Sequence, residues 1–305
     1  MDAPELTILG CGSALPTTKH NLSSQVLAIR NKLYMIDCGE GTQLEFRRQK
    51  LNFNKIGHIF LSHLHGDHCF GIPGLISTLG LLGRTADLYI HAQPQAEPIL
   101  QTVLDFFCKE SPFKVLFKPF DPQKHTLIHE DRSMEVYTIP LKHRVPTAGF
   151  LFVEKPKKPH IRRDACEFYG VPVWKMNEIK AGANFITPEG ELIPHEKLTR
   201  PAAKPKKYAY CADTAYHESI IPIIEGVDLL YHEATFTQKD IARARETLHS
   251  SAAQAATIAQ AAQVKKLLLG HFSARYPNEQ VLLDEARSIF PNTELADEGV
   301  KIKIT

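Results

Sequence analysis

Residues 62–68 read SHLHGDH and place three histidines and an aspartate within six positions. They follow HIFL at residues 58–61, a short apolar run that is typical of a buried β-strand. Side chains two positions apart on an extended chain point the same way, so His63 and His65 can share one metal ion. The end of this strand is therefore a candidate metal site.

The second half of the same stretch provides ligands for another ion. Gly66 allows the chain to turn sharply, so Asp67 and His68 can face a different direction from the first pair. Imidazole and carboxylate ligands together suit Zn²⁺. We therefore expect two zinc ions rather than one.

Two ions need more ligands than one loop holds, and three further candidates follow apolar runs elsewhere. They are His143 in IPLKHRV, Asp213 in YCADT and His271 in LLLGHFS. Loops that follow the strands of a sheet gather on its rim and commonly carry function. A carboxylate such as Asp213 can bridge two ions, which suits it to a position between the clusters.

Composition places the chain among globular proteins. Its 305 residues are 43% hydrophobic and 23% charged, which excludes a disordered or fibrous chain. A formal net charge of +2 does not by itself indicate nucleic-acid binding. The N-terminus lacks the pattern of a signal peptide and no apolar run is long enough to span a bilayer. Six scattered cysteines without a C-x-x-C pair indicate reduced thiols and a cytoplasmic protein.

Periodicity predicts an alternation of strands and helices, which favours stacked sheet and helix layers in the α/β class. The expected strands are 6–10, 57–62, 88–92, 114–120, 133–141, 147–155, 207–214, 228–235, 265–273 and 300–305, together with a hairpin over 23–39 that turns at RNK. Residues 40–50 have helical spacing. The expected helices are 71–84, 94–109, 218–226, a serine-capped helix within 250–263, and 278–290.

Residues 155–207 interrupt this alternation. Prolines are dense there, and 12 lysines and arginines stand against 6 acidic residues. Such a segment is either a long excursion or a small insertion in one domain spanning 1–305.

The motifs together resemble a known family. SHLHGDH resembles the H-x-H-x-D-H signature of the metallo-β-lactamase fold, a four-layer αβ/βα sandwich. LGCGSALPTTKHNLSS, DCGEGTQ, PLKHRVPTAGF, ADT, HEATF, LHSSAAQAA and GHFSARY follow the order found in tRNase Z, the endoribonuclease family that processes the 3′ end of precursor tRNA. The resemblance covers nearly the whole chain.

This resemblance implies a ligand set for two zinc ions per subunit. His63, His65 and His143 would bind one, Asp67, His68 and His271 the other, and Asp213 would bridge them. It also implies three catalytic residues. Asp67 would act on the attacking water as ligand and proton acceptor, and His249, oriented by Glu233, would protonate the leaving ribose oxygen.

Residues 155–207 resemble the flexible arm, or exosite, with which short bacterial members of the family clamp tRNA. The candidate contacts are Lys155, Lys157, Lys158, Arg162, Arg163, Lys175 and Lys180. The usual glycine–proline-rich tip is altered here to YGVPVWKMNEIKAG, and Trp174 within it could stack or merely pack.

We therefore expect a zinc-dependent endoribonuclease that removes the 3′ trailer of precursor tRNA by cutting 3′ to the discriminator base. The family implies a homodimer in which each arm serves the other subunit. Two alternatives stay open: a hydrolase of small phosphodiesters, sulfate esters or thioesters, and a non-enzymatic RNA-binding scaffold. The basic arm disfavours the first, since a small substrate needs no distant electrostatic clamp. The intact ligand set disfavours the second.

Overall fold

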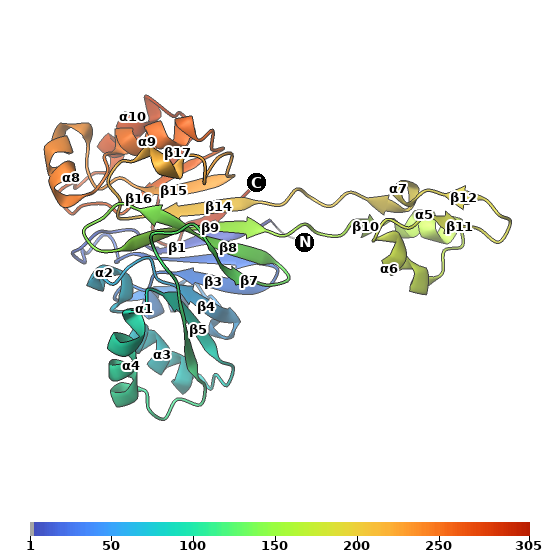
Figure 1. Ribbon diagram of the computed structural model, residues 1–305, viewed down its shortest axis with the longest axis horizontal. Coiled ribbons are helices and arrows are strands. Elements are labelled where there is room, and N and C mark those ends of the chain that lie inside the picture. Colours follow the sequence, from blue (N-terminus) through green and yellow to red (C-terminus); the bar gives the residue numbers. More distant parts are fainter. Residues whose placement is uncertain (1–2) are drawn as a thin grey trace. The chain divides into compact units, whose positions relative to one another are not determined.

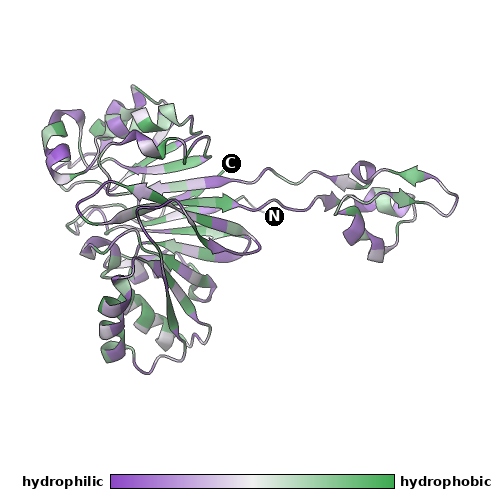
Figure 2. Cartoon of the chain, viewed as in Figure 1, coloured by the Kyte–Doolittle hydropathy of each residue, from purple (hydrophilic) through white to green (hydrophobic). Residues whose placement is uncertain are grey.

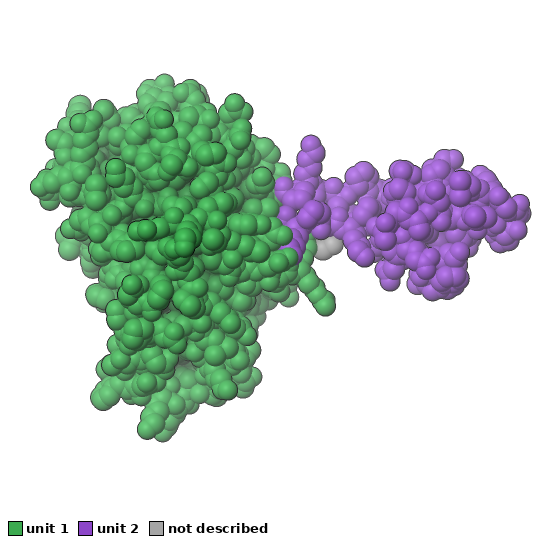
Figure 3. All heavy atoms as spheres, viewed as in Figure 1, with its two compact units in different colours: residues 1–153, 206–305 green, residues 154–205 purple. Residues whose placement is uncertain are grey.

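A computed structural model describes residues 3–305. The chain divides into two compact units, one comprising the residues up to 153 together with 206–305, and the other residues 154–205 (Figure 3). Within the described residues, no helix combines the length and the apolar character needed to cross a membrane.

The first sheet of the larger unit has seven strands in the order β18-β1-β2-β3-β4-β5-β6. Its strands are β1 (Glu5–Gly10), β2 (Ser24–Ile29), β3 (Lys32–Ile36), β4 (Ile56–Phe60), β5 (Leu88–Ala92), β6 (Val115–Pro119) and β18 (Lys301–Lys303). Strands β3 to β6 are parallel to one another, so their carboxyl ends meet at one edge of the sheet.

The second sheet also has seven strands, in the order β17-β16-β15-β14-β9-β8-β7. They are β7 (Leu127–Glu130), β8 (Met134–Leu141), β9 (Thr147–Glu154), β14 (Lys207–Cys211), β15 (Leu229–Glu233), β16 (Leu267–Gly270) and β17 (Thr293–Leu295). Strands β14 to β17 are parallel, and they too end at a common edge.

Helices cover the outer face of each sheet, which completes the predicted four-layer sandwich (Figure 1). On the first sheet these are α1 (Thr42–Arg48), α3 (Ile72–Leu81) and α4 (Ala96–Phe107), and on the second α8 (Ile241–Thr247), α9 (Ala252–Ala261) and α10 (Gln280–Arg287). Short elements connect them: η1 (Phe53–Lys55), α2 (Gly66–Cys69), η3 (Glu218–Ile220) and η4 (Gln238–Asp240).

Successive side chains of a strand point to opposite faces, which explains how the first sheet is buried on both faces. In β3, Leu33 and Met35 belong to the core beneath the helices, whereas Tyr34 and Ile36 belong to the core between the two sheets. Successive strand side chains point to opposite faces, so an uninterrupted apolar strand serves two cores at once. The strands of Figure 2 accordingly carry long apolar stretches.

The predicted strands are found close to their expected bounds, but the helix expected at 218–226 is wrong. Only the short turn η3 forms there. An α-helix beginning at residue 218 would need the N–H of residue 222 for its first hydrogen bond, and that residue is Pro222. By contrast α9 begins where expected, because Ser251 and Gln254 form a capping box.

The smaller unit, residues 154–205, has a core of its own. Its elements are β10 (His160–Ile161), α5 (Arg163–Phe168), η2 (Val173–Lys175), α6 (Met176–Ile179), β11 (Phe185–Ile186), β12 (Leu192–Ile193), α7 (His195–Leu198) and β13 (Thr199–Arg200). The buried side chains are Cys166, Val171, Ile179, Phe185, Ile193 and Leu198. Trp174 lies outside this core and is 68% exposed.

Candidate metal and active site

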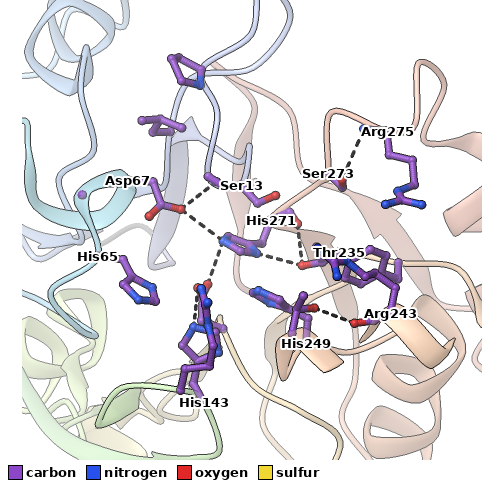
Figure 4. Close-up of a pocket in the computed structure, with 18 of the residues that line it drawn as sticks. Ser13, His65, Asp67, His143, Thr235, Arg243, His249, His271, Ser273 and Arg275 are labelled. Atoms are coloured by element: carbon purple, nitrogen blue, oxygen red, sulfur yellow. Dashed lines mark hydrogen bonds and ion pairs between the residues drawn. The ribbon is translucent and has the colours of Figure 1, made fainter. Parts of the chain in front are cut away.

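The ligand candidates follow the ends of strands from both sheets. His63 comes shortly after β4, His143 after β8, Asp213 after β14 and His271 directly after β16. Figure 4 shows His65, Asp67, His143 and His271 pointing toward one another. They lie on or beside a cavity of about 660 Å³. The fold therefore gathers residues that are far apart in sequence.

One group of side chains surrounds the Oδ2 atom of Asp213. This oxygen lies 3.4 Å from His63 Nε2 and 3.7 Å from His143 Nε2. His63 Nε2 lies 2.9 Å from His65 Nδ1, so the ring nitrogens converge. Three imidazoles and one carboxylate can thus contribute to a single coordination shell.

A second group surrounds the other oxygen of the same carboxylate. Asp213 Oδ1 lies 3.3 Å from His68 Nε2 and 2.8 Å from His271 Nε2. Asp67 Oδ2 lies 3.5 Å from His68 Nε2 and 3.8 Å from His271 Nε2. Asp213 therefore faces one cluster with each oxygen, which is the arrangement a bridging ligand needs.

Two of these residues have an unusual backbone. Asp213 and His271 both have a φ of 58°, in the left-handed region that few residues other than glycine adopt. Such conformations cost free energy and concentrate at functional sites, where the surrounding structure maintains them. Here they turn both side chains from the strand ends into the cavity.

Unsatisfied polar atoms provide a test of whether a cation fits. His68 Nε2, His143 Nε2, His271 Nε2 and Asp213 Oδ1 are buried, and apart from the ion-pair contacts with one another given above they form no hydrogen bond within the described part of the chain. Buried polar atoms without partners are rare in folded proteins and call for an explanation. Metal ions between these nitrogens and oxygens would supply the missing partners, so the residues fit such a group.

The ionisation states also suit cation binding. Burial opposes the charge on Asp213, but the charges of His271, His68 and His63 outweigh it and lower its pKa. Burial likewise lowers the pKa of His63 and of His143, which favours the neutral imidazole. Metal ligands must be deprotonated, so these shifts lower the cost of binding a cation in the first cluster. In the second cluster the Asp213 carboxylate outweighs burial and raises the pKa of His68 and of His271, so a cation there would displace protons.

Asp37 supports the second cluster from behind. It directly follows β3, is fully buried, and lies with Oδ2 2.8 Å from His68 Nδ1. Ser62 Oγ donates to the same oxygen at 2.9 Å, and Tyr210 OH donates to it at 2.7 Å. A carboxylate behind a ligating histidine fixes its tautomer and orientation. Sequence reasoning missed Asp37, although it stands in the quoted DCGEGTQ.

Other histidines of the site are oriented in the same way. His143 Nδ1 lies 3.1 Å from the Leu248 carbonyl oxygen, and His271 Nδ1 lies 3.0 Å from Thr235 Oγ1. His63 Nδ1 lies 3.0 Å from Ser62 Oγ. In each case the Nδ1 atom is engaged, so the Nε2 atom is left to face the cavity.

Glu233 and His249 form a separate pair at the edge of the clusters. His249 Nδ1 lies 3.0 Å from Glu233 Oε1, and Ser250 N donates to Glu233 Oε2 at 3.0 Å. Burial disfavours the charge on His249, but the Glu233 carboxylate outweighs this and raises the pKa of the imidazole. His249 lines the cavity, so its second ring nitrogen can reach a bound substrate.

The loop that contains Ala14 contacts Asp67. Ala14 N donates to Asp67 Oδ2 at 2.8 Å, which orients this carboxylate. Gly66 does not adopt a positive φ as a sharp turn would require; it begins α2 instead. A Cβ atom at Gly66 would come within 2.4 Å of Phe70 Cε2. The Phe70 ring therefore leaves no room for a larger residue than glycine at this position.

Three arginines that sequence reasoning did not select also line the cavity. They are Arg144, Arg243 and Arg275. Arg243 and Arg275 lie on the same side as His249 in Figure 4. Guanidinium groups bind phosphate oxygens in a bidentate manner, so this wall suits a phosphodiester. Arg144 and Arg275 stand in the quoted motifs PLKHRVPTAGF and GHFSARY, so a signal was present for these two; no quoted motif contains Arg243.

Within the smaller unit, the seven basic candidates differ in their surroundings. Lys158 and Arg163 are exposed, whereas the other five are half-buried. Lys157 Nζ lies 2.8 Å from Glu154 Oε1, and its side chain is 9% exposed. Lys175 Nζ lies 5.2 Å from the centre of the Trp174 ring. Lys157 is thus held by an ion pair that a phosphate contact would have to replace.

Comparisons with known proteins agree with this geometry. A family model described as anti-Pycsar protein Apyc1 matches residues 4–156, a stretch that ends before Asp213, Glu233, His249 and His271. Over 98% of this chain and 99% of the relative, the sequence is 60% identical to ribonuclease Z of Parabacteroides distasonis. It is 58% identical to ribonuclease Z of Phocaeicola vulgatus over 100% of this chain and 98% of the relative.

Solved structures give the same fold. The short form of human tRNase Z superposes with a TM-score of 0.72 at 24% identity and covers 99% of both chains. The metallo-β-lactamase-fold protein YhfI of Bacillus subtilis superposes with a TM-score of 0.69 at 19% identity, also over 99% of both chains. The predicted metallo-β-lactamase fold is thereby confirmed, and the identity to curated relatives along the whole chain decides the family: this chain belongs to the ribonuclease Z family.

Proposed function

We propose that this protein is an endoribonuclease that removes the 3′ trailer of precursor tRNA by cutting 3′ to the discriminator base. One observation carries the proposal: the two oxygens of Asp213 face two separate clusters of ligand-type side chains, beside the His249–Glu233 pair. The names of relatives at 53–60% identity give the substrate class. Hydrolysis there leaves a 3′-hydroxyl on the tRNA and a 5′-phosphate on the trailer.

We assign two zinc ions to the site. One ion would be held by His63, His65 and His143. The other would be held by Asp67, His68 and His271, and Asp213 would contribute to both. Two zinc ions bound there would activate a water molecule and polarise the scissile phosphodiester. Nitrogen and oxygen ligands with a predominance of imidazole support zinc over magnesium or calcium, which prefer oxygen ligands.

The side chains of the protein would move the protons. Asp67, oriented by Ala14 N, would accept the proton of the attacking water. His249 would donate a proton to the ribose oxygen as the bond to phosphorus breaks, and Glu233 would hold the imidazole in position. The raised pKa of His249 keeps this proton available near neutral pH.

Substrate binding would use positive charge at two places. Arg144, Arg243 and Arg275 line the cavity and would contact the phosphates next to the scissile bond. The smaller unit would bind tRNA phosphates far from that bond, chiefly through exposed basic side chains such as Lys158 and Arg163. This arm assignment rests on the resemblance and on the excess of basic residues.

We also infer a cytoplasmic homodimer. All six cysteines are free, which suits a reducing compartment. The C-terminal ends of α3 and α4 expose Leu81, Leu82, Phe106 and Phe107, with Leu81 86% exposed. Exposed large apolar side chains at these helix ends suit a protein interface, and a second copy of this chain is the partner that the family implies.

Mapping the cut on a precursor tRNA with a 3′ trailer tests the proposed activity. We expect one cut, directly after the discriminator base, that disappears with chelator and returns when zinc is added back. Mature tRNA without a trailer is the control and should stay intact. Cleavage of an aryl phosphodiester without any cleavage of precursor tRNA would instead support a small-molecule hydrolase.

A further inference from the structure

A second concentration of histidines lies away from the catalytic cavity. His58 is on β4, His91 is on β5 and His129 is on β7, so the three come from both sheets of the sandwich (Figure 1). Each offers a ring nitrogen within 4.8 Å of the others. None of the three lines the catalytic cavity.

The three rings are packed closely enough to share one ion. His58 Nδ1 lies 3.0 Å from His91 Nε2. The ring centres of His58 and His129 are 4.0 Å apart, and those of His91 and His129 are 5.5 Å apart. Nitrogen ligands bind zinc at about 2.0–2.1 Å, so a tetrahedral ion separates its ligand nitrogens by roughly 3.4 Å. Small side-chain rotations are enough to reach that spacing.

Two buried nitrogen atoms of the cluster have no hydrogen-bond partner among the described residues. They are His91 Nδ1 and His129 Nε2. His91 would offer the ion its Nε2 atom, which faces His58, so of these two atoms it is His129 Nε2 whose missing partner an ion would supply. A simple aromatic packing role leaves this cost unexplained, because phenylalanine would fill the same space without it.

A β-bulge interrupts the strand that carries His129. Strand β7 pairs with β8 through Leu127–Tyr137 and then through His129–Val136, so one extra residue interrupts the register. Such a bulge redirects the side chains that follow it and is often found beside functional sites. Strand β7 lies at the edge of its sheet, where a link to the first sheet would stabilise it.

The lowered pKa values of the three histidines favour the binding of a metal ion over the binding of a proton. Burial lowers the pKa of His58 to about 4 and that of His91 to about 3, and it also lowers the pKa of His129. All three imidazoles are therefore neutral near pH 7, and a bound cation would replace the hydrogen bond between His58 Nδ1 and His91 Nε2. Asp131 Oδ2 lies 3.7 Å from His129 Nε2 and adds a negative charge beside the cluster.

We propose that His58, His91 and His129 form a third metal site, which binds Zn²⁺ or a similar first-row transition-metal ion and links β7 to the first sheet. Three imidazoles from three strands suit such an ion, and water would complete the coordination. The role of this site is structural, since it lies outside the cavity that holds the proposed chemistry.

Zinc content and thermal unfolding test this site. The variants are His58→Gln and His129→Gln, with His160→Gln, an exposed histidine outside the cluster, as the matched control. Each is stripped of metal, reloaded with excess zinc, passed through a desalting column and analysed for bound zinc. We expect each cluster variant to hold one zinc fewer per chain than the parent and the control, and to keep its cleavage activity at moderate temperature.

The unfolding temperature should respond in parallel. In an Asp213→Ala background, which removes the proposed catalytic bridge, added zinc should still raise the melting temperature. Adding His129→Gln to that background should make this rise smaller, because only the ligands left in the catalytic clusters would still bind zinc. Equal zinc content in the parent and both cluster variants, with an unchanged zinc response, would overturn the proposal. If the variants do not fold, native mass spectrometry of the parent decides: saturation at two zinc ions, without a third, overturns it.

Discussion

Asp213 shows how much of the site depends on single side chains. Its left-handed backbone aims the carboxylate between two clusters, and each oxygen meets a different set of histidines. The sequence predicted Asp213, His143 and His271, because each follows an apolar run and strand ends gather at a rim. Asp37 and Arg275 also stand in quoted motifs, but their contacts follow from which strands and loops become neighbours in the fold, so the sequence alone did not assign them.

Asp67→Ala should abolish cleavage of precursor tRNA while leaving tRNA binding within about twofold of the parent. In the proposed mechanism the carboxylate acts on the attacking water, whereas affinity comes from contacts to phosphates. Single-turnover cleavage and a filter-binding assay measure the two effects separately. Glu40→Ala is the matched control, because Glu40 is an exposed carboxylate of the same cavity. Near-parental turnover by the Asp67 variant would remove Asp67 from the mechanism.

His249→Ala should slow cleavage of precursor tRNA by about two or more orders of magnitude, the usual contribution of a general acid. The loss should be much smaller on an aryl phosphodiester whose leaving group needs no proton. Parallel rate measurements on the two substrates give the comparison. An equal loss on both would show that His249 positions the substrate instead.

At the scale of elements, the strands were predictable and the connections were less so. Apolar runs such as 58–61 form strands because both of their faces are covered. The helix expected at 218–226 does not form, and only a short turn is found there. Pro222 argues against a helix at this position, but the prediction gave more weight to the helical spacing of the apolar residues. Residues 154–205 looked aperiodic because their core is built from six residues spread over short elements.

The arm itself gives a prediction. Replacing residues 162–200 with a short Gly/Ser linker should leave both catalytic clusters intact, since none of their members lies there. Activity on an aryl phosphodiester should survive. Affinity for precursor tRNA should fall at least about tenfold, or roughly 1.4 kcal/mol, and its salt dependence should flatten.

A less drastic variant provides the control for that deletion. Exchanging Lys158 and Arg163 for glutamine removes exposed charge but keeps the small core, so the folded arm is retained. Binding titrations at several salt concentrations should show an intermediate loss. Parental affinity and salt slope in the linker variant would refute the tRNA clamp, and loss of activity on both substrates would point to a role in folding or assembly.

At the scale of the whole molecule, the exposed apolar ends of α3 and α4 predict self-association. Leu81→Glu combined with Phe106→Glu should shift the protein from dimer to monomer in sedimentation velocity, because two buried charges oppose the contact. Val281→Glu on α10, where Val281 is 49% exposed, is the control and should stay dimeric. A double variant that sediments as the parent does would exclude this surface.

The most direct test of the account is diffraction at the zinc absorption edge from crystals of the metal-loaded protein. We predict two anomalous peaks in the catalytic cavity, about 3.5–4 Å apart, with one oxygen of Asp213 bound to each. His63, His65 and His143 should surround one peak, and Asp67, His68 and His271 the other. A fully active crystalline protein with no peak beside Asp213, or with a single ion there, would contradict the two-metal centre.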